Sequence, residues 1–142
     1  MKTAELCRCR VGHVSSVDPT AGTARVVFDD KQGLVSYNLP VLQRNTLKNK
    51  DEAWPDPGEH VVCLFLGNGL EQGFVLGAIY DRKNRPPVGD QDVRVTTFED
   101  GTTLKVDRKN HIVEVKDFYG SYIRFAEGNI YIKSHADVHI NK

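Results

Sequence analysis

Several features that would place a protein quickly in a class are scarce or missing here. No run of apolar residues approaches the roughly 20 that a membrane-spanning helix needs, and residues 1–12 hold no apolar stretch of signal-peptide length. We therefore expect a soluble protein that is cytoplasmic at synthesis. Cysteine is rare and odd in number, with Cys7, Cys9 and Cys63 in 142 residues. This count argues against a disulfide framework and favours folding in a reducing compartment.

An excess of charge of one sign is also missing. Lys and Arg number 19, Asp and Glu number 19, and aromatic residues make up only 8% of the chain. Proteins that follow a nucleic-acid strand use basic grooves and aromatic stacking platforms, so nucleic acid is not an expected partner. Hydrophobic residues at 39% and charged residues at 27% are ordinary for a soluble globular protein.

Helical periodicity is almost absent, and short apolar runs alternate with turn signals throughout the chain. Residues 5–29 predict a β-hairpin, with strands at residues 6–17 and 23–28 and turn chemistry at residues 18–22. Further strands are expected at residues 34–42, 59–66 and 73–80. About five strands in residues 1–80 suit a small Greek-key barrel of the OB type.

A polar segment rich in Pro and Gly, residues 81–92, marks a boundary, and we expect two domains at residues 1–85 and 86–142. Beyond it, short alternating runs recur between turn signals. These runs are residues 93–98, 102–106, 111–115, 121–125, 129–133 and 137–141. A short repeat of alternating strands is typical of a stacked β-structure.

The alternation in the C-terminal runs places large apolar side chains on one parity. The predicted stripe consists of Ile123, Phe125, Ile130, Ile132, Val138 and Ile140. Burying each contributes roughly 1.5–3 kcal/mol, or about 9–18 kcal/mol per chain as an upper bound. Three chains wound around one axis would bury all the stripes together, so we predict a homotrimer with these residues as its core.

Three segments resemble, in the same order, segments of the phage baseplate assembly protein V family. Residues 54–62 (WPDPGEHVV) resemble its Trp-, Pro- and Gly-Glu-containing segment, and residues 73–80 (GFVLGAIY) resemble the strand that follows. Residues 98–107 (FEDGTTLKVD) look like the family's step into its β-prism. The resemblance extends from about Val11 to Ile140. The family comprises the central spikes of contractile tails and is related to the spike of type VI secretion.

The resemblance implies an all-β fold, with an N-terminal OB-fold-like barrel followed by a short, intertwined, trimeric β-helix. It implies a structural, non-enzymatic spike of the virion tail baseplate, assembled in the host cytoplasm. Such a spike docks on a baseplate hub protein and pierces the host outer membrane when the sheath contracts. No cofactor is implied.

One feature departs from the family. Longer members end in a His-x-His that binds iron on the threefold axis, whereas three residues separate His135 and His139 here. Both histidines also have the parity opposite to the aliphatic residues, which is the solvent side. We therefore expect no metal ligands at this end, and a separate tip-capping protein on a blunt spike.

The cysteines and histidines do not form a recognisable site in the sequence. Cys7 and Cys9 are too close for the usual structural zinc spacing, and we interpret both as small buried residues on one strand face. Cys63, inside an apolar run, is expected in the core. His60 and His111 lie beside strands without a nucleophile motif, so no catalytic residues are predicted.

Two interpretations of Trp54 are open, and two alternative functions of the chain are also considered. Trp54, the single Trp, is either a loop aromatic packed on the barrel or an anchor at the hub interface, where Trp is enriched. The alternative function is an OB-fold module that binds oligosaccharide or single-stranded nucleic acid. A tail-associated lytic enzyme is a third class, but 142 residues leave no room for a hydrolase domain beside the barrel and the tail.

Overall fold

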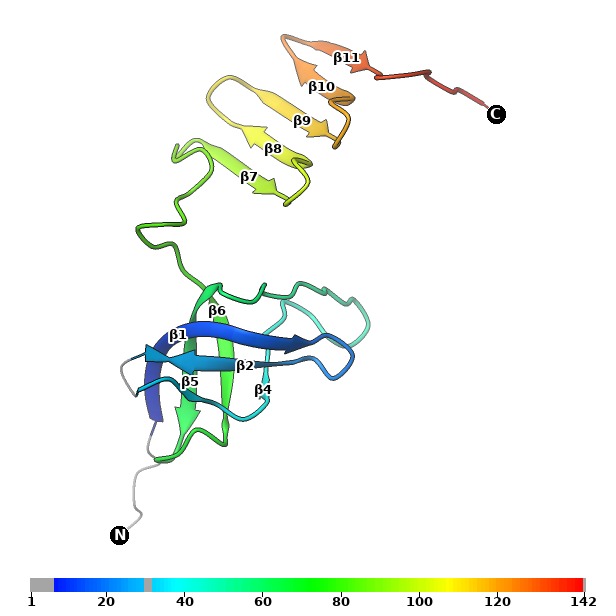
Figure 1. Cartoon of the computed structure of the whole chain (residues 1–142). Helices are drawn as coiled ribbons and strands as arrows, with labels where there is room; N and C mark the ends of the chain where they lie inside the picture. The colour runs from blue at the N-terminus through cyan, green and yellow to red at the C-terminus, as the bar shows by residue number, and fades with distance from the viewer. Residues whose placement is uncertain (1–6, 30–31, 142) are drawn as a thin grey trace. The chain divides into compact units, whose positions relative to one another are not determined.

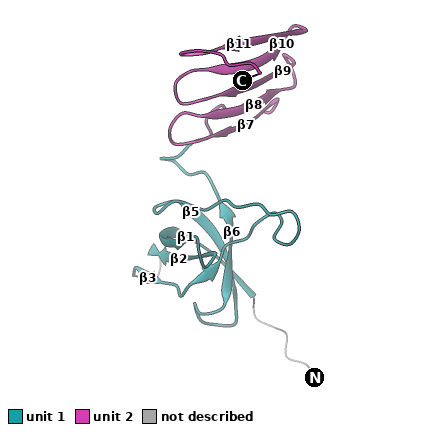
Figure 2. Ribbon diagram, turned by 90° about the vertical axis from the view of Figure 1, so that its right-hand side faces the viewer, with its two compact units in different colours: residues 1–85 teal, residues 86–142 magenta. Residues whose placement is uncertain are grey.

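The computed structural model describes residues 7–29 and 32–141 and divides the chain into two compact units, residues 1–85 and 86–142 (Figure 2). Both units consist of antiparallel β-strands, and the described residues contain no α-helix. The predicted all-β class is therefore confirmed. The first residues of the predicted hairpin, Glu5 and Leu6, lie outside the described residues.

The first unit contains one six-stranded sheet (Figure 1). Its strands are β1 (Cys7–Asp18), β2 (Thr23–Phe28), β3 (Leu34–Val35), β4 (Leu39–Pro40), β5 (His60–Leu66) and β6 (Gly73–Ala78). The order is β3-β2-β1-β5-β6, and β4 pairs with β2 on the same side as β3. The long strand β1 therefore lies at the centre and connects the hairpin partner β2 to β5.

The β1–β2 hairpin forms where the sequence predicts it. The amide of Gly22 donates to the carbonyl of Asp18 over 2.9 Å, and Gly22 adopts a φ of 74° that favours glycine. The Asp18 carboxylate accepts a further hydrogen bond from the amide of Ala21. The predicted turn at residues 18–22 and the strand at residues 23–28 are thus confirmed.

The core of the first unit lies on one face of this curved sheet. Its buried hydrophobic residues are Val14, Ala24, Val26, Phe28, Leu39, Val61, Cys63, Phe65 and Val75. The rings of Phe28 and Phe65 meet edge to face at 5.6 Å between centroids. Ser36 is also fully buried, and its hydroxyl accepts from the amide of Val26 and donates to the carbonyl of Tyr37. The prediction that Cys63 belongs to the core is confirmed.

The two ends of the six-stranded sheet approach each other at one point. Val41, which follows β4, forms a single parallel bridge with Val75 of β6, and the amide of Leu42 donates to the carbonyl of Val75. In the described part of the chain this contact does not extend into a strand ladder. The closed OB-type barrel therefore stays a prediction.

The second unit is a five-stranded meander. Its strands are β7 (Val93–Thr97), β8 (Thr103–Asp107), β9 (Ile112–Lys116), β10 (Tyr122–Ala126) and β11 (Asn129–Lys133). Each pairs with the next in sequence, so the order is β11-β10-β9-β8-β7. Turns at Asp100, Asp107 and Asp117 recur, and in each the Asp carboxylate accepts hydrogen bonds from backbone amides a few residues later. These side-chain bonds explain why strands this short turn back so sharply.

The predicted strand at residues 137–141 is wrong for the single chain. After β11 the chain bends, with the hydroxyl of Ser134 bonded to the carbonyl of Asp137, and residues 137–141 form no strand. Their alternating pattern has no neighbouring strand to pair with in one chain, and an unpaired strand leaves its backbone groups unsatisfied. The trimeric β-helix, which needs other chains, stays a prediction.

Candidate functional site

The register of the second sheet gathers large apolar side chains on one face. Ile123 of β10 lies opposite Ile132 of β11, and Phe125 lies opposite Ile130, so these pairs share a face. The pairing continues through β9 and β8 in two rows. We call the resulting set the apolar face: Leu104, Val106, Val113, Val115, Ile123, Phe125, Ile130 and Ile132.

The apolar face is open to solvent in the single chain. The exposed fraction of its side chains ranges from 42% for Val113 to 64% for Ile130. Isolated exposed hydrophobic residues are normal on a protein surface, but a contiguous patch marks an interaction site. Eight such side chains in two rows constitute a contiguous patch.

The opposite face of the same sheet is mostly polar, with Val93, Val95 and Ile112 as apolar exceptions, and its side chains on β8 to β10 are better covered. Glu114 is only 7% exposed and forms an ion pair with Arg124 of the neighbouring strand β10. The guanidinium of Arg124 also lies 4.5 Å from the centre of the Tyr122 ring, and its hydrogen bond to Glu114 raises the pKa of Arg124. Long polar side chains thus shield each other while the aliphatic side chains face water. Because removal of apolar area from water is favourable, the apolar face is the candidate interaction surface of the second unit.

Four of the six predicted trimer-core residues lie on the apolar face. These are Ile123, Phe125, Ile130 and Ile132. Val138 and Ile140 lie beyond the last strand and are 54% and 75% exposed. Whether any of the six is buried in an assembly stays a prediction.

Sequence reasoning missed half of the apolar face. Leu104, Val106, Val113 and Val115 occupy the same two rows on strands β8 and β9. The signal was present, because these residues alternate with polar ones in the same way as the C-terminal runs do. The apolar face therefore extends over four strands, from β8 to β11.

Trp54 lies on the loop before β5 and is half-buried. Its indole nitrogen donates to the carboxylate of Glu52, and its ring reaches within 3.7 Å of where a side chain on Gly22 would begin. The loop itself is held by reciprocal hydrogen bonds between the Gln43 amide and the backbone of Ala53. The ring thus packs beside the β1–β2 turn, and the hub-facing role stays a prediction.

The two N-terminal cysteines are not buried, which corrects the sequence interpretation. Cys7 and Cys9 are exposed, whereas Arg8 and Arg10 occupy the opposite parity of β1. Arg10 stacks over the Phe28 ring at 4.4 Å, and Arg8 donates to three carbonyls of residues 67–69. The charged side chains cover the end of the core through their stems and planar heads, which turns the small thiols outward.

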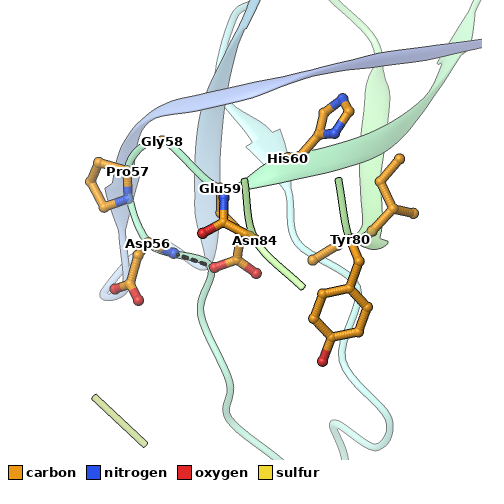
Figure 3. Close-up of a pocket in the computed structure, with 9 residues that line it drawn as sticks. Asp56, Pro57, Gly58, Glu59, His60, Tyr80 and Asn84 are labelled. Carbon is orange, nitrogen blue, oxygen red and sulfur yellow. Dashed lines mark hydrogen bonds between the residues drawn. The ribbon is translucent and has the colours of Figure 1, made fainter. Parts of the chain in front are cut away.

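A pocket of about 520 Å³ opens at the start of β5 and the end of β6 in the first unit (Figure 3). Its lining residues are Asp56, Pro57, Gly58, Glu59, His60, Ala78, Ile79, Tyr80 and Asn84. The Glu59 carboxylate accepts a hydrogen bond from the amide of Asp56. These lining residues include two carboxylates, the ring of Tyr80 and the imidazole of His60 but no Lys or Arg, which does not suit a phosphate backbone.

The C-terminal histidines do not come together with other metal ligands in the single chain. The ring of His135 stacks on Tyr119 at 5.7 Å, and His139 lies in the irregular segment after β11. The predicted absence of a metal there stays a prediction. Among the described residues, one group has ligand atoms close enough for a metal ion, and it consists of His13, His60 and Asp81 in the first unit.

Comparison with known proteins gives one informative similarity. No protein-family model matches the chain. A search of curated proteins finds similarity to the "Spike protein" of Escherichia phage P2, with 27% identity over 106 residues. The matched region covers 75% of this chain and 49% of that protein, so the chain spans about half the length of the curated relative it matches.

Within the described residues, no helix has the length and apolar character needed to cross a membrane.

Proposed function

We propose that this chain is a structural, non-enzymatic component of a phage tail spike, and that it works as a homotrimer. The observation that carries the proposal is the apolar face of the second sheet, which is exposed in one chain and continuous over four strands. The similarity to the spike protein of phage P2 supports the same role. The resemblance of three ordered segments to baseplate assembly protein V points in the same direction.

Burial of the apolar face provides the free energy for assembly. Each of its eight side chains is about half exposed, so full burial contributes roughly 0.8–1.5 kcal/mol per side chain and roughly 6–12 kcal/mol per chain. Part of this gain is offset by the loss of translational and rotational freedom on association.

A trimer accounts for the sheet edges as well as the apolar face. Two chains packed face to face would cover the apolar faces but leave the edges of β7 and β11 unpaired. In a three-chain β-helix, each edge can pair with a strand of a neighbouring chain. Residues 137–141, which alternate in sequence but find no partner in one chain, would then become the next strand.

In this proposal the two units have different roles. The first unit, an OB-type barrel, docks on the baseplate hub protein, with Trp54 in the contact. The second unit forms the short β-helical spike that is driven through the host outer membrane when the sheath contracts, and a separate protein caps its blunt end. The chain is assembled in the host cytoplasm and becomes part of the virion tail baseplate.

The alternative of an OB-fold binding module has less support. The pocket of the first unit presents Asp56 and Glu59 to any ligand, and the chain has no net positive charge to attract nucleic acid. An oligosaccharide site would use several broad aromatic platforms, whereas Tyr80 and the smaller imidazole of His60 are the rings among the described lining residues. We therefore favour the spike.

The functional test is the location of the chain in particles. Tail particles purified by density gradient from the bacterium that encodes this chain should contain it, and antibodies raised against the first unit should label the baseplate end of the tail. Recovery of the chain in the soluble fraction alone, with unlabelled particles, would contradict the proposal.

A further inference from the structure

Two histidines meet on the outer face of the first sheet. His13 of β1 and His60 of β5 are direct partners across the antiparallel pair, so their side chains leave the same face next to each other. Their rings stack with centroids 4.7 Å apart and an angle of 9° between the planes. Strand register thus brings together two imidazoles that stand far apart in the sequence.

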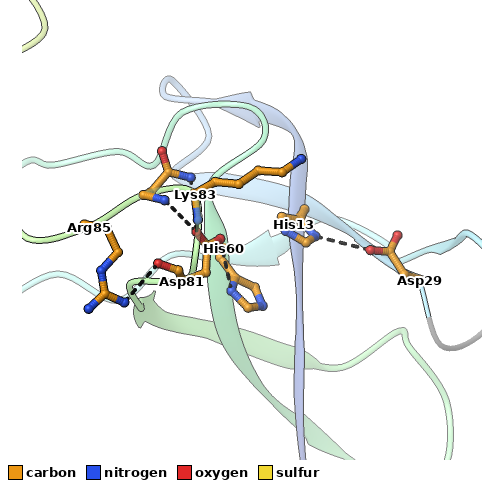
Figure 4. Close-up of polar contacts among 7 residues, drawn as sticks. His13, Asp29, His60, Asp81, Lys83 and Arg85 are labelled. Atoms are coloured by element: carbon orange, nitrogen blue, oxygen red, sulfur yellow. Dashed lines mark hydrogen bonds and ion pairs between the residues drawn. The ribbon is translucent and has the colours of Figure 1, made fainter.

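A carboxylate faces this pair from a third segment (Figure 4). Asp81 follows β6, and its Oδ1 accepts hydrogen bonds from the amides of Lys83 and Asn84 over 2.9 and 2.7 Å. Its Oδ2 is thereby directed at Nδ1 of His60, 3.6 Å away.

The side chain of His60 contains a buried polar atom without a hydrogen bond. Its Nδ1 is shielded from solvent and has no hydrogen-bond partner among the described residues, because 3.6 Å to Asp81 exceeds hydrogen-bonding distance. Buried polar atoms without a partner are rare in folded proteins and call for an explanation such as a bound ion. An imidazole nitrogen beside a carboxylate is a typical place for a divalent transition metal.

We propose that His13, His60 and Asp81 form a binding site for a divalent transition-metal ion of the zinc type. One ligand atom from each residue lies within 4.8 Å of the others. In a tetrahedral zinc site with bonds of about 2.0–2.1 Å to nitrogen, neighbouring ligand atoms are roughly 3.3 Å apart. Because the lone pair of an imidazole lies in its ring plane, one of the two stacked rings turns out of the stack when both nitrogens bind one ion, and water completes the coordination.

Asp29 supports the site from outside the ligand set. Its carboxylate lies 3.5 Å from Nδ1 of His13, which leaves Nε2 of that ring for the ion. A carboxylate behind a metal-bound histidine fixes the orientation of the ring and raises its basicity. Bound metal would tie β1, β5 and the segment after β6 together, and that segment leads out of the first unit.

Zinc titration of the full chain, stripped of metal with a chelator, tests the proposal by calorimetry. One ion should bind per chain, and Co²⁺ should give the visible absorption of a low-symmetry site. His60→Gln and Asp81→Asn should each lower the affinity by more than the roughly 10–100-fold that loss of an outer carboxylate costs, and Asp29→Asn should fall within that range. Zinc should also raise the unfolding temperature of the native chain but not of His60→Gln.

The matched control removes histidines elsewhere. The double variant His135→Gln/His139→Gln should keep one ion per chain. Loss of binding in that variant, binding that survives both His60→Gln and Asp81→Asn, or no binding to the native chain would each overturn the site. If His60→Gln fails to fold, judged by circular dichroism, Asp81→Asn on the surface loop decides the question alone. None of these results depends on whether the chain is a spike.

Discussion

At the scale of single residues, the first unit contains a position where no side chain fits. Gly12 sits in β1 on the core side, and a Cβ atom placed there would lie 2.6 Å from the carbonyl oxygen of Val27 and 2.8 Å from the Phe28 ring. This absence of a side chain lets β2 pass close over β1. Gly77 in β6, by contrast, has nothing within 4 Å of the point where a Cβ atom would lie, so glycine is not required there for space.

We expect Gly12→Ala to destabilise the first unit by about 1–3 kcal/mol, because the methyl group overpacks the core. Gly77→Ala is the matched control and should change the stability by less than about 0.5 kcal/mol, as surface substitutions usually do. Urea unfolding of both variants measures the difference. Equal stabilities would show that the strands separate easily at Gly12.

The three cysteines should differ sharply in reactivity. Burial raises the pKa of Cys63 to about 11, with the nearby Arg10 charge lowering it in part, and the side chain is fully buried. Cys7 and Cys9 are exposed. A thiol-specific disulfide reagent near neutral pH should therefore modify Cys7 and Cys9 in the native protein, and Cys63 only after denaturation. Fast modification of all three would contradict the assigned strand parity.

The turn aspartates should make stability depend on pH. Hydrogen bonds from the amides of Asn110 and Thr102 lower the pKa of Asp107 and Asp100 respectively. The folded state therefore binds protons less readily than the unfolded chain, whose Asp pKa is about 3.9. The stabilisation is complete above that value and is lost as the pH falls through the lowered folded values.

Thermal unfolding across this acid range tests the pH dependence. Asp107→Asn should lower the unfolding temperature at neutral pH and flatten the acid dependence, because the charged acceptor of the turn is removed. Glu99→Gln changes the same charge without touching the hydrogen bonds of either turn and should leave the profile as it is. An Asp107→Asn profile that matches the native one would contradict the assigned role of the turn.

At the scale of elements, alternation and turn chemistry were enough to predict most strands. β2 has the predicted bounds, and the five strands of the second sheet differ from the predicted runs by at most one residue at either end. The predicted strand at residues 137–141 is absent, because alternation marks a possible strand but does not show which strand pairs with it. The prediction that Cys7 and Cys9 are buried is wrong, because the sequence does not reveal that the side chains of Arg8 and Arg10 can cover a core.

The apolar face could be predicted in part from the sequence, but the group of His13, His60 and Asp81 could not. Ile123 and Ile132 could be assigned to one face, since parity alone fixes which side chains share a face. The grouping of His13, His60 and Asp81 could not be predicted, because it depends on the register of β1 with β5 and on a loop conformation. Local patterns carry no information about such long-range register.

The apolar face gives a prediction for a single element, strand β11. Ile132→Asp places an unpaired carboxylate in the dry interior of the proposed trimer in three copies, and each copy costs several kcal/mol. We expect the variant to stay monomeric while the first unit, which has its own core, stays folded. Asn129→Asp adds the same charge to the polar face of β11 and should still assemble. Size-exclusion chromatography with circular dichroism separates these outcomes.

At the scale of the whole molecule, the two units differ in where their hydrophobic side chains lie. Among its described residues, the first unit buries nine hydrophobic side chains in a core of its own. The second unit has a ladder of five strands, yet the eight large hydrophobic side chains of its apolar face are exposed to water, whereas Glu114 on the opposite face is buried. This arrangement supports the proposal that the chain assembles as a homotrimer.

The mass of the full chain in solution tests that claim most directly. Light scattering at micromolar concentration should give about 48 kDa, three times the 15.9 kDa of one chain, with no dependence on dilution in that range. A monodisperse species of 15.9 kDa would contradict the account, because the apolar face would then be stable in water without a partner.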